Sequence, residues 1–386
     1  MNWITSRIKG DVVIWAIVII LSIFSLLAVY SSTGSLAYKK QAGNTEYYLI
    51  KQLMMILGGL FLMYLAHRVN YIYYSRVGQL LLIITIPLLL ITYATGSSIN
   101  EARRWLTLPG TSITIQTSDI AKLALMMFLA RMLSKHQKNI NDFKKAFLPM
   151  AGATFIICAL IAPSNLSTAM LLFASSFLLM FIGRVPLKYL GLMILTVVVG
   201  FGLLILTAKA LHLPVRVSTW QSRIENYMSD TKDEDASYQE KQAKIAIATG
   251  GIFGKMPGNS TQKNFLPNPF SDFIYAIIIE EYGMIGGIFI MILYLVLLYR
   301  SIIIVVQSPK AFGALLSVGL TFSLVFQAFL NMGVATGRFP VTGLTLPLIS
   351  MGGTSILFTS FSLGIILSVS RNIEENKEAE KLLAQS

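Results

Sequence analysis

Apolar stretches long enough to cross a lipid bilayer follow one another along almost the whole chain. A hydrocarbon core about 30 Å thick needs about 20 consecutive apolar residues in a helix. About ten such stretches can be placed, at residues 11–31, 50–67, 77–95, 119–134, 147–163, 165–183, 187–208, 272–299, 310–331 and 342–370. The pattern therefore predicts an all-α polytopic membrane protein with about ten transmembrane helices, forming a single transmembrane domain over residues 1–386.

One long connection separates the seventh and eighth of these stretches. It covers about residues 209–271. Within it, residues 217–228 and 238–249 have apolar positions at helical spacing, and an acidic turn at 229–235 joins them. We expect two short helices that lie over the bundle, and the alternative is a solvated linker.

The distribution of basic residues predicts which side each connection faces. If the N-terminus is inside, Lys and Arg are more frequent in the inside connections than in the short outside loops. The positive-inside rule then places both termini, residues 1–10 and 371–386, in the cytoplasm. The long loop at 209–271 becomes extracytoplasmic, and the protein is predicted to be a multi-pass protein of the cytoplasmic membrane.

Composition narrows the possible functions further. The chain is 55% hydrophobic and 13% charged, so its net charge of +13 indicates contact with membrane surfaces rather than with nucleic acid. It has one cysteine, Cys158, which excludes a disulfide framework. No P-loop, dinucleotide-binding, zincin or nucleophile-elbow motif occurs, and the three histidines lack ligand spacing. Nucleotide-driven chemistry and an organic cofactor are therefore not expected.

Asp272 stands where the long outer loop enters the eighth apolar stretch. A carboxylate held at the boundary between water and membrane is suited to taking a proton from a substrate hydroxyl. The alternative interpretation is that Ser271 and Asp272 cap the start of the helix.

Other acidic residues lie within the apolar stretches, where ionisable groups are costly and are functional candidates by default. Asp119 and Lys122 are spaced i and i+3, so they can pair on one helical face, either as a structural pair or as part of a site. On a continuous helix Glu280 lies about 80° around from Asp272, so it can share a cavity with Asp272, whereas Glu281 faces away. A buried contact between helices is the alternative for Glu280.

Cationic residues of the outer connections are candidates for binding an anionic headgroup. Arg103 and Arg104 stand beside Trp105, and a guanidinium group matches the geometry of phosphate oxygens. Lys255 and Lys263 bracket a Gly-rich turn ahead of Asp272. These residues can hold a pyrophosphate, or they can attract anionic lipid in general.

Three long motifs resemble one protein family. Residues 259–267 read Asn-Ser-Thr-Gln-Lys-Asn-Phe-Leu-Pro, and they are followed by Ser-Asp-Phe-Ile at 271–274 and Glu-Glu-Tyr-Gly at 280–283. Residues 343–347 read Gly-Leu-Thr-Leu-Pro, with Ser-Met-Gly-Gly-Thr-Ser at 350–355, and Arg-Arg-Trp stands at 103–105. The sequence resembles the SEDS family (shape, elongation, division, sporulation) over nearly its whole length.

The resemblance implies a ten-helix peptidoglycan glycosyltransferase that polymerises lipid II, with undecaprenyl pyrophosphate as the leaving group. It also implies a class B penicillin-binding protein as partner, together with other division proteins and membrane lipids. The Gln262–Lys263 pair is more similar to the division member than to the elongation member, which implies a location at the division septum. A lipid II flippase, an elongation polymerase and a non-catalytic division scaffold are the alternatives.

The functional residues of the family can be matched to positions in this sequence. Asp272 matches the family's outer-loop aspartate, the expected general base, and Asp119 and Lys122 match an acid and a lysine of the fourth helix. The resemblance assigns substrate binding to Arg103, Arg104, Trp105, Asp119, Lys122, Lys263, Glu280, Ser350, Gly352 and Gly353. A divalent cation, Mg²⁺ or Mn²⁺, is expected to offset the charge of the leaving group, and its ligands are unknown.

Two stretches depart from the family pattern. Residues 116–119 read Gln-Thr-Ser-Asp where many members have Gln-Pro-Ser-Glu, which shortens the acid but keeps its charge. Residues 164–167 read Ser-Asn-Leu-Ser where many members have Pro-Asp-Leu-Gly, so an acid is lost.

Overall fold

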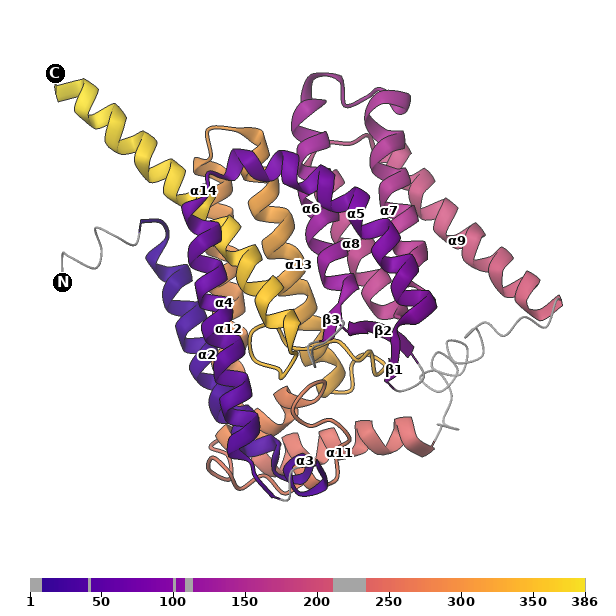
Figure 1. The fold of residues 1–386 in the computed structure, drawn as a ribbon, viewed down its shortest axis with the longest axis vertical. Helices are drawn as coiled ribbons and strands as arrows, with labels where there is room; N and C mark the ends of the chain where they lie inside the picture. Colours follow the sequence, from indigo (N-terminus) through magenta and orange to yellow (C-terminus); the bar gives the residue numbers. More distant parts are fainter. Residues whose placement is uncertain (1–8, 41–42, 100–101, 108–113, 211–233, 386) are drawn as a thin grey trace.

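The structure is a computed structural model that describes residues 9–40, 43–99, 102–107, 114–210 and 234–385. The long helices are α2 (Val12–Ser32), α4 (Glu46–Arg68), α5 (Tyr74–Thr95), α6 (Thr117–Lys135), α7 (Leu148–Ile161), α8 (Leu166–Ile182), α9 (Leu187–Ala210), α12 (Ile274–Gln307), α13 (Ala311–Ala335) and α14 (Thr354–Gln385). Most of the long helices stand side by side in a bundle, while the C-terminal part of α9 runs outward from it (Figure 1). Each of the predicted apolar stretches overlaps one of these helices.

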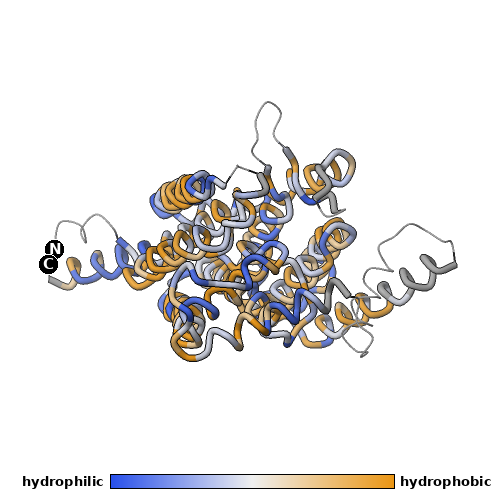
Figure 2. The backbone as a smooth tube through the Cα atoms, turned by 90° about the horizontal axis from the view of Figure 1, so that it is seen from below, coloured by the Kyte–Doolittle hydropathy of each residue, from blue (hydrophilic) through white to orange (hydrophobic). Residues whose placement is uncertain are grey.

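Length and hydropathy identify the helices that can span a membrane. In the described part of the chain, seven helical spans are long and apolar enough. α6 is not among them because its sequence includes Asp119, Lys122, Arg131 and Lys135. α8 is apolar but shorter. Apolar residues cover much of the bundle, whereas the C-terminal end of α14 is hydrophilic and extends beyond it (Figure 2).

An ion pair and a hydrogen bond join three helices at the end of the bundle where α2 begins (Figure 1). The side chain of Asp11 caps α2 by accepting hydrogen bonds from the first backbone N–H groups of the helix. The same carboxylate pairs with Arg300 of α12 at 2.7 Å. Glu374 of α14 accepts a hydrogen bond from Gly10 N at 2.7 Å. α2, α12 and α14 are therefore fixed in relative height at this end.

The opposite end of the bundle carries residues 234–271 of the long connection and is called the α11 end. α11 (Glu234–Gly250) lies across it and packs against α12, and α3 (Gly34–Lys40) lies at the same end (Figure 1). α11 confirms the predicted helix at 238–249. Glu234 and Asp235, which were expected in the turn, instead belong to its first turn. The other predicted helix, 217–228, lies outside the described residues.

A small antiparallel sheet was not predicted. Its strands are β1 (Ser97–Ile99), β2 (Ala102–Thr107) and β3 (Thr114–Gln116), in the order β1-β2-β3. The strands are too short to show an alternating apolar pattern that could be read from the sequence. The sheet follows α5 directly and leads into α6, and the described residues form no other strand.

Two predicted helical stretches contain non-helical backbone. In α12, Gly283 has φ 72° and ψ −175°, so a short helix at 274–282 is separated from the long helix at 284–307. The stretch 342–370 is helical only from Thr354 onwards. Hydropathy cannot distinguish a helix from a buried loop when the backbone groups of the loop are hydrogen-bonded inside the protein.

The turn after α11 is bonded to the break in α12 through the main chain. Met284 N donates to Gly251 O at 2.9 Å, and Lys255 N donates to Glu280 O at 2.9 Å. A Cβ added to Gly283 would lie 2.1 Å from Ile252 O, and its φ is positive. Only glycine allows the two backbones to come this close.

We therefore expect Gly283→Ala to lower the stability of the purified protein by more than about 1 kcal/mol, because the new methyl group meets a carbonyl oxygen at a positive φ. Thermal unfolding in detergent measures the effect. Gly152→Ala in α7 is the matched control, since nothing lies within 4 Å of the added Cβ. Equal melting temperatures for the two variants would contradict the close approach.

Candidate active site

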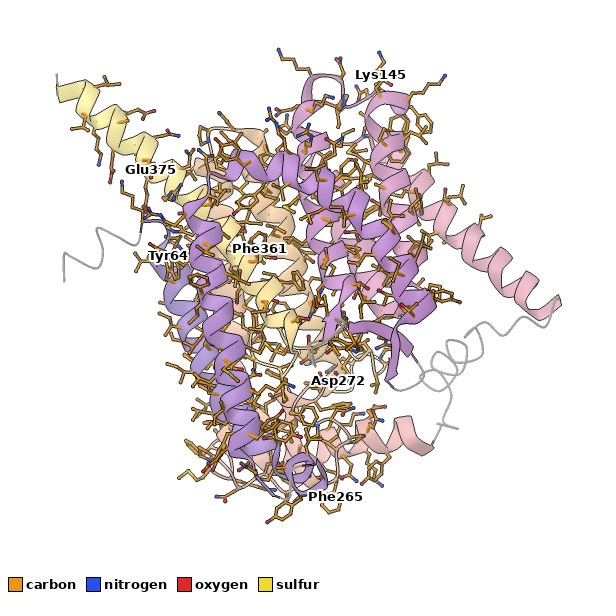
Figure 3. The ribbon with its side chains drawn as sticks, in the orientation of Figure 1. Tyr64, Lys145, Phe265, Asp272, Phe361 and Glu375 are labelled. Atoms are coloured by element: carbon orange, nitrogen blue, oxygen red, sulfur yellow. The ribbon has the colours of Figure 1, made fainter. Side chains whose placement is uncertain are left out.

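Asp272 lies at the α11 end, just ahead of the short helix that opens α12 (Figure 3). Ser271 Oγ donates to Asp272 Oδ1 at 2.9 Å, and the side-chain amide of Asn331 donates to Asp272 O at 2.9 Å. The N-cap residue of α12 is Phe273, and no side chain caps it. The capping interpretation of Ser271 and Asp272 is therefore wrong, and the Asp272 carboxylate is not used to start the helix.

Two non-helical segments, 270–272 and 343–351, are bonded side by side. Met351 N donates to Phe270 O at 2.9 Å, and Ser350 Oγ donates to Ser271 O at 2.7 Å. Ser350 Oγ also accepts from Leu346 N at 2.8 Å. Ser350 thus holds the backbone next to Asp272 in position. The sequence predicted instead that Ser350 contacts the substrate.

Arg104 faces the same space as Asp272. A Cβ added to Gly343 would lie 3.7 Å from both Arg104 Nη1 and Asp272 Oδ2, so the two groups approach Gly343 together. β2 carries Arg104, and its Nε donates to Ser164 O at 2.7 Å in the connection between α7 and α8. Arg104 is therefore held by the connection between α7 and α8, and its Nη1 and the Asp272 carboxylate both lie beside Gly343.

The other members of the predicted headgroup cluster are less closely placed. Trp105 lies next along β2, opposite Gln116 of β3. Arg103 is in β2, but its side chain lies outside the described part. Gly352 and Gly353 precede α14, whose first residue, Thr354, bonds to Thr114 O of β3 at 3.3 Å. Their contact with substrate stays a prediction.

The environment of Asp272 changes its acidity. Burial raises the pKa of the Asp272 carboxyl above its ordinary value of 3.8, while the hydrogen bond from Ser271 and the charge of Arg104 act in the opposite direction. The side chain keeps some solvent exposure. A carboxylate with a raised pKa is a stronger base than one in water, as a general base requires.

Asp119 and Lys122 form an ion pair inside the bundle at 2.8 Å. Lys122 Nζ also donates to Gln327 Oε1 at 2.9 Å, and Gln327 Nε2 donates to Thr345 O at 2.8 Å. The pair is thus connected to the same 343–351 segment that supports Asp272. Among the described residues, no donor reaches Asp119 Oδ2.

A cavity of about 30 Å³ borders this ion pair, between α6, α13 and α14. Ser323, Ser355, Thr359 and Ser362 contribute hydroxyl groups to its lining. Such a volume holds about two water molecules. Water in the cavity can satisfy Asp119 Oδ2, which would otherwise be a buried acceptor without a donor.

Glu280 does not join Asp272, contrary to the prediction. Its buried carboxylate accepts from Lys255 Nζ at 2.7 Å, Thr261 Oγ1 at 2.8 Å and Ser260 Oγ. Glu280 therefore fastens the outer loop to the short helix at 274–282. Lys263 belongs to the same loop, where its Nζ donates to Gly258 O at 2.7 Å, so its headgroup role stays a prediction.

Sequence reasoning missed two residues that organise the site. Asn331 bonds both Asp272 O and Leu344 O, and Gln327 connects Lys122 with Thr345. The two amides are spaced i and i+4 on α13, so they lie on one helical face. Two amide side chains at this spacing in an apolar stretch are the sequence feature from which both residues could have been predicted.

The expected divalent cation can be compared with the acidic, histidine and cysteine side chains of the described residues. No group of three His, Cys, Asp or Glu side chains in the described ranges is arranged to hold an ion. The Mg²⁺ or Mn²⁺ ion therefore stays a prediction.

Comparison with known proteins identifies the family. A model of the FtsW, RodA and SpoVE cell cycle proteins matches residues 11–375. The chain belongs to this family. The resemblance to the SEDS motifs is thereby confirmed, and with it the prediction of an integral membrane protein.

Relatives and solved structures cover nearly the whole chain. Stage V sporulation protein E of Bacillus subtilis is 33% identical over 373 residues, covering 95% of this chain and 98% of the relative. A probable peptidoglycan glycosyltransferase FtsW of Geobacter sp. strain M18 is 32% identical, covering 94% and 98%. A chain of a solved peptidoglycan synthase complex matches with a TM-score of 0.70 and 26% identity, covering 94% and 98%. Rod shape determining protein RodA of Thermus thermophilus matches with a TM-score of 0.67 and 24% identity, covering 96% and 99%, which supports the fold.

Substitutions of Asp119 and Lys122 test whether the two buried charges stabilise each other. We expect Lys122→Ala to cost about 3–5 kcal/mol, because it leaves a buried carboxylate unpaired, and we expect Asp119→Ala/Lys122→Ala to cost less than that single change. Thermal unfolding of the three variants in detergent measures the coupling. A double variant whose loss equals the sum of the two single losses would show that the residues do not stabilise each other.

Proposed function

We propose that this chain is a peptidoglycan glycosyltransferase that polymerises lipid II at the outer face of the cytoplasmic membrane, with Asp272 as the general base. Membership of the FtsW, RodA and SpoVE family supports this activity, since several relatives are named as probable peptidoglycan glycosyltransferases. The observation that carries the assignment to Asp272 is its carboxylate with raised pKa facing Arg104 across Gly343.

The reaction needs a base and a positive charge in one place. A hydroxyl of the acceptor sugar attacks the anomeric carbon of the donor, forming a C–O bond while the bond to pyrophosphate breaks. Asp272 accepts the hydroxyl proton, and undecaprenyl pyrophosphate leaves with the electron pair. Arg104 stabilises the negative charge that develops on the pyrophosphate oxygens.

Both groups are positioned before substrate binds. The backbone at Asp272 is held by Asn331, and Ser350 holds the backbone at Ser271. Arg104 is held by the carbonyl oxygen of Ser164. Charges fixed in advance stabilise a transition state without reorganisation during the reaction.

The orientation and the cellular role are part of the same proposal. Both termini face the cytoplasm, and the α11 end faces outward, where lipid II presents its headgroup. We assign the role to cell division at the septum, because the relatives include FtsW proteins and because Gln262 and Lys263 follow the division pattern. The related chain in a complex that coordinates polymerization and crosslinking supports a class B penicillin-binding protein as partner.

Transport of lipid II is less well supported than polymerisation. The cavity beside the Asp119–Lys122 pair measures about 30 Å³, far below the roughly 300 Å³ or more that a site enclosing a ligand needs. Asp272, the candidate base, lies toward the α11 end of the bundle instead of its middle (Figure 3). An elongation polymerase would use the same site, and a non-catalytic scaffold would not need the Asp272 charge.

We expect Asp272→Asn to reduce glycan polymerisation by at least about 100-fold. Asparagine has nearly the same shape as aspartate, but its amide cannot accept the proton of the sugar hydroxyl. The assay uses the purified chain with its class B partner and lipid II, and follows polymer length on a gel. Glu46→Gln is the matched control, an exposed carboxylate at the start of α4. Equal polymer from Asp272→Asn and the wild type would remove Asp272 from the mechanism and favour the scaffold.

The pH dependence of the reaction tests the state of the same carboxyl group. A base must be deprotonated, so activity is lost as the pH falls through its pKa. Because the pKa of Asp272 is raised, we expect the acid limb of kcat/KM to lie above pH 3.8. Rates of lipid II polymerisation across pH, with thermal unfolding recorded at each pH to exclude denaturation, measure this limb. A limb at or below 3.8 would contradict the raised pKa.

A further inference from the structure

The turn that follows α11 exposes three large apolar side chains within five residues. Ile252 is 63% exposed, Phe253 79% and Met256 68%. Single exposed apolar residues are ordinary on protein surfaces, but a cluster of this kind marks a contact surface. The turn, defined here as Gly251–Met256, is therefore expected to be covered by something other than water.

The turn continues the apolar surface of α12. Met284 and Ile285 are also exposed, and they begin the long helical part of this membrane-spanning segment. Ile285 N donates to Ile252 O at 3.4 Å, next to the bond between Met284 N and Gly251 O. Exposed apolar residues on a spanning helix face lipid. The turn is thus bonded directly to the start of this exposed apolar part of α12.

Helix lengths place the turn at the edge of the hydrocarbon core. The apolar sequence of α2 begins at Val12, next to Asp11, so one boundary of the core lies near Asp11. Asp11 pairs with Arg300 of α12, and the apolar sequence of α12 continues about 10 Å beyond Arg300 toward Gln307. Gly283 stands about 25 Å from Arg300 along α12, and Ser31 about 30 Å from Asp11 along α2, at 1.5 Å per residue. Ser31 donates a hydrogen bond to Glu281, two residues before Gly283. Since the core is about 30 Å thick, Gly283 and the turn bonded to it lie at the other boundary.

Charge within the turn is neutralised. Lys255 is its one charged residue, and its Nζ pairs with the buried carboxylate of Glu280 at 2.7 Å. A lysine at the edge of a bilayer can also extend its ammonium group to the headgroups, so Lys255 does not oppose contact of the turn with lipid. The pairing lets the flanking apolar side chains approach lipid without exposing this charge to it.

We propose that the Gly251–Met256 turn is an interfacial membrane anchor. Ile252, Phe253 and Met256 enter the boundary between headgroups and acyl chains of the leaflet at the α11 end, beside the start of the long helix of α12. Aromatic and aliphatic side chains are favoured at this depth, where the buried apolar area supplies the binding energy.

The anchor also sets the height of Asp272. Lys255 is bonded to Glu280 through both its backbone and its side chain, and Glu280 lies on the short helix that begins two residues after Asp272. A turn fixed in the leaflet therefore fixes the carboxylate at a defined distance from the lipid surface. The reacting bond of a lipid-linked substrate lies at a constant height above the acyl chains. A base that acts on such a substrate has to be held at a matching height.

Spin labelling measures the depth directly. In a Cys158→Ser background, Phe253→Cys is labelled and the full chain is placed in bilayers of phosphatidylethanolamine and phosphatidylglycerol. We expect the ratio of collisions with oxygen to collisions with a water-soluble nickel chelate to be several-fold higher at this position than at Phe265→Cys. Phe265 is the matched control, an aromatic residue of the same loop that is 55% exposed and lies at the far α11 end (Figure 3).

Each outcome decides the proposal without relying on enzymatic activity. A high ratio at position 253 supports the anchor. A ratio no higher than that at position 265 overturns it, because the turn would then lie in water. A label that is immobile and shielded from both oxygen and nickel also overturns it, since a protein surface would then cover the turn. Both sites are exposed, so neither label is expected to disturb folding.

Discussion

The side-chain amide of Asn331 joins the two non-helical segments on which the candidate site is built. It donates to Asp272 O on one segment and to Leu344 O on the other, from a buried position on α13. Backbone groups that leave a helix near a membrane need partners within the protein. One amide supplies them for both segments, so the position of Asp272 depends on α13 as much as on its own helix.

The same principle explains the rest of the polar interior. Gln327, one turn away on α13, holds Thr345 O and Lys122, and Lys122 in turn neutralises Asp119. Ser350 holds the carbonyl of Ser271. The charged pair, the two amides and the irregular backbone form one connected network, in which each member satisfies a group that would otherwise be buried without a partner.

Hydropathy was enough to predict the helical fold and the approximate helices, because a spanning helix must be apolar over a fixed length. It could not predict the break at Gly283 or the loop at 343–353, since an internally bonded loop is as apolar as a helix. The motifs led to Asp272 and Arg104, which the structure brings together. Angular spacing on a continuous helix misplaced Glu280, because the short helix at 274–282 does not extend back through Asp272 and turns Glu280 toward the outer loop.

Arg104 is held by the main-chain oxygen of Ser164, not by a side chain. This is the connection in which the chain departs from its family by carrying Asn165 in place of an acid, and Asn165 instead caps α8 by accepting from Thr168 N at 3.2 Å. A carbonyl acceptor is present whatever residue a mutation introduces. The connection can therefore diverge in sequence while its backbone path keeps the guanidinium in place, so a lost motif residue here is no sign of a lost function.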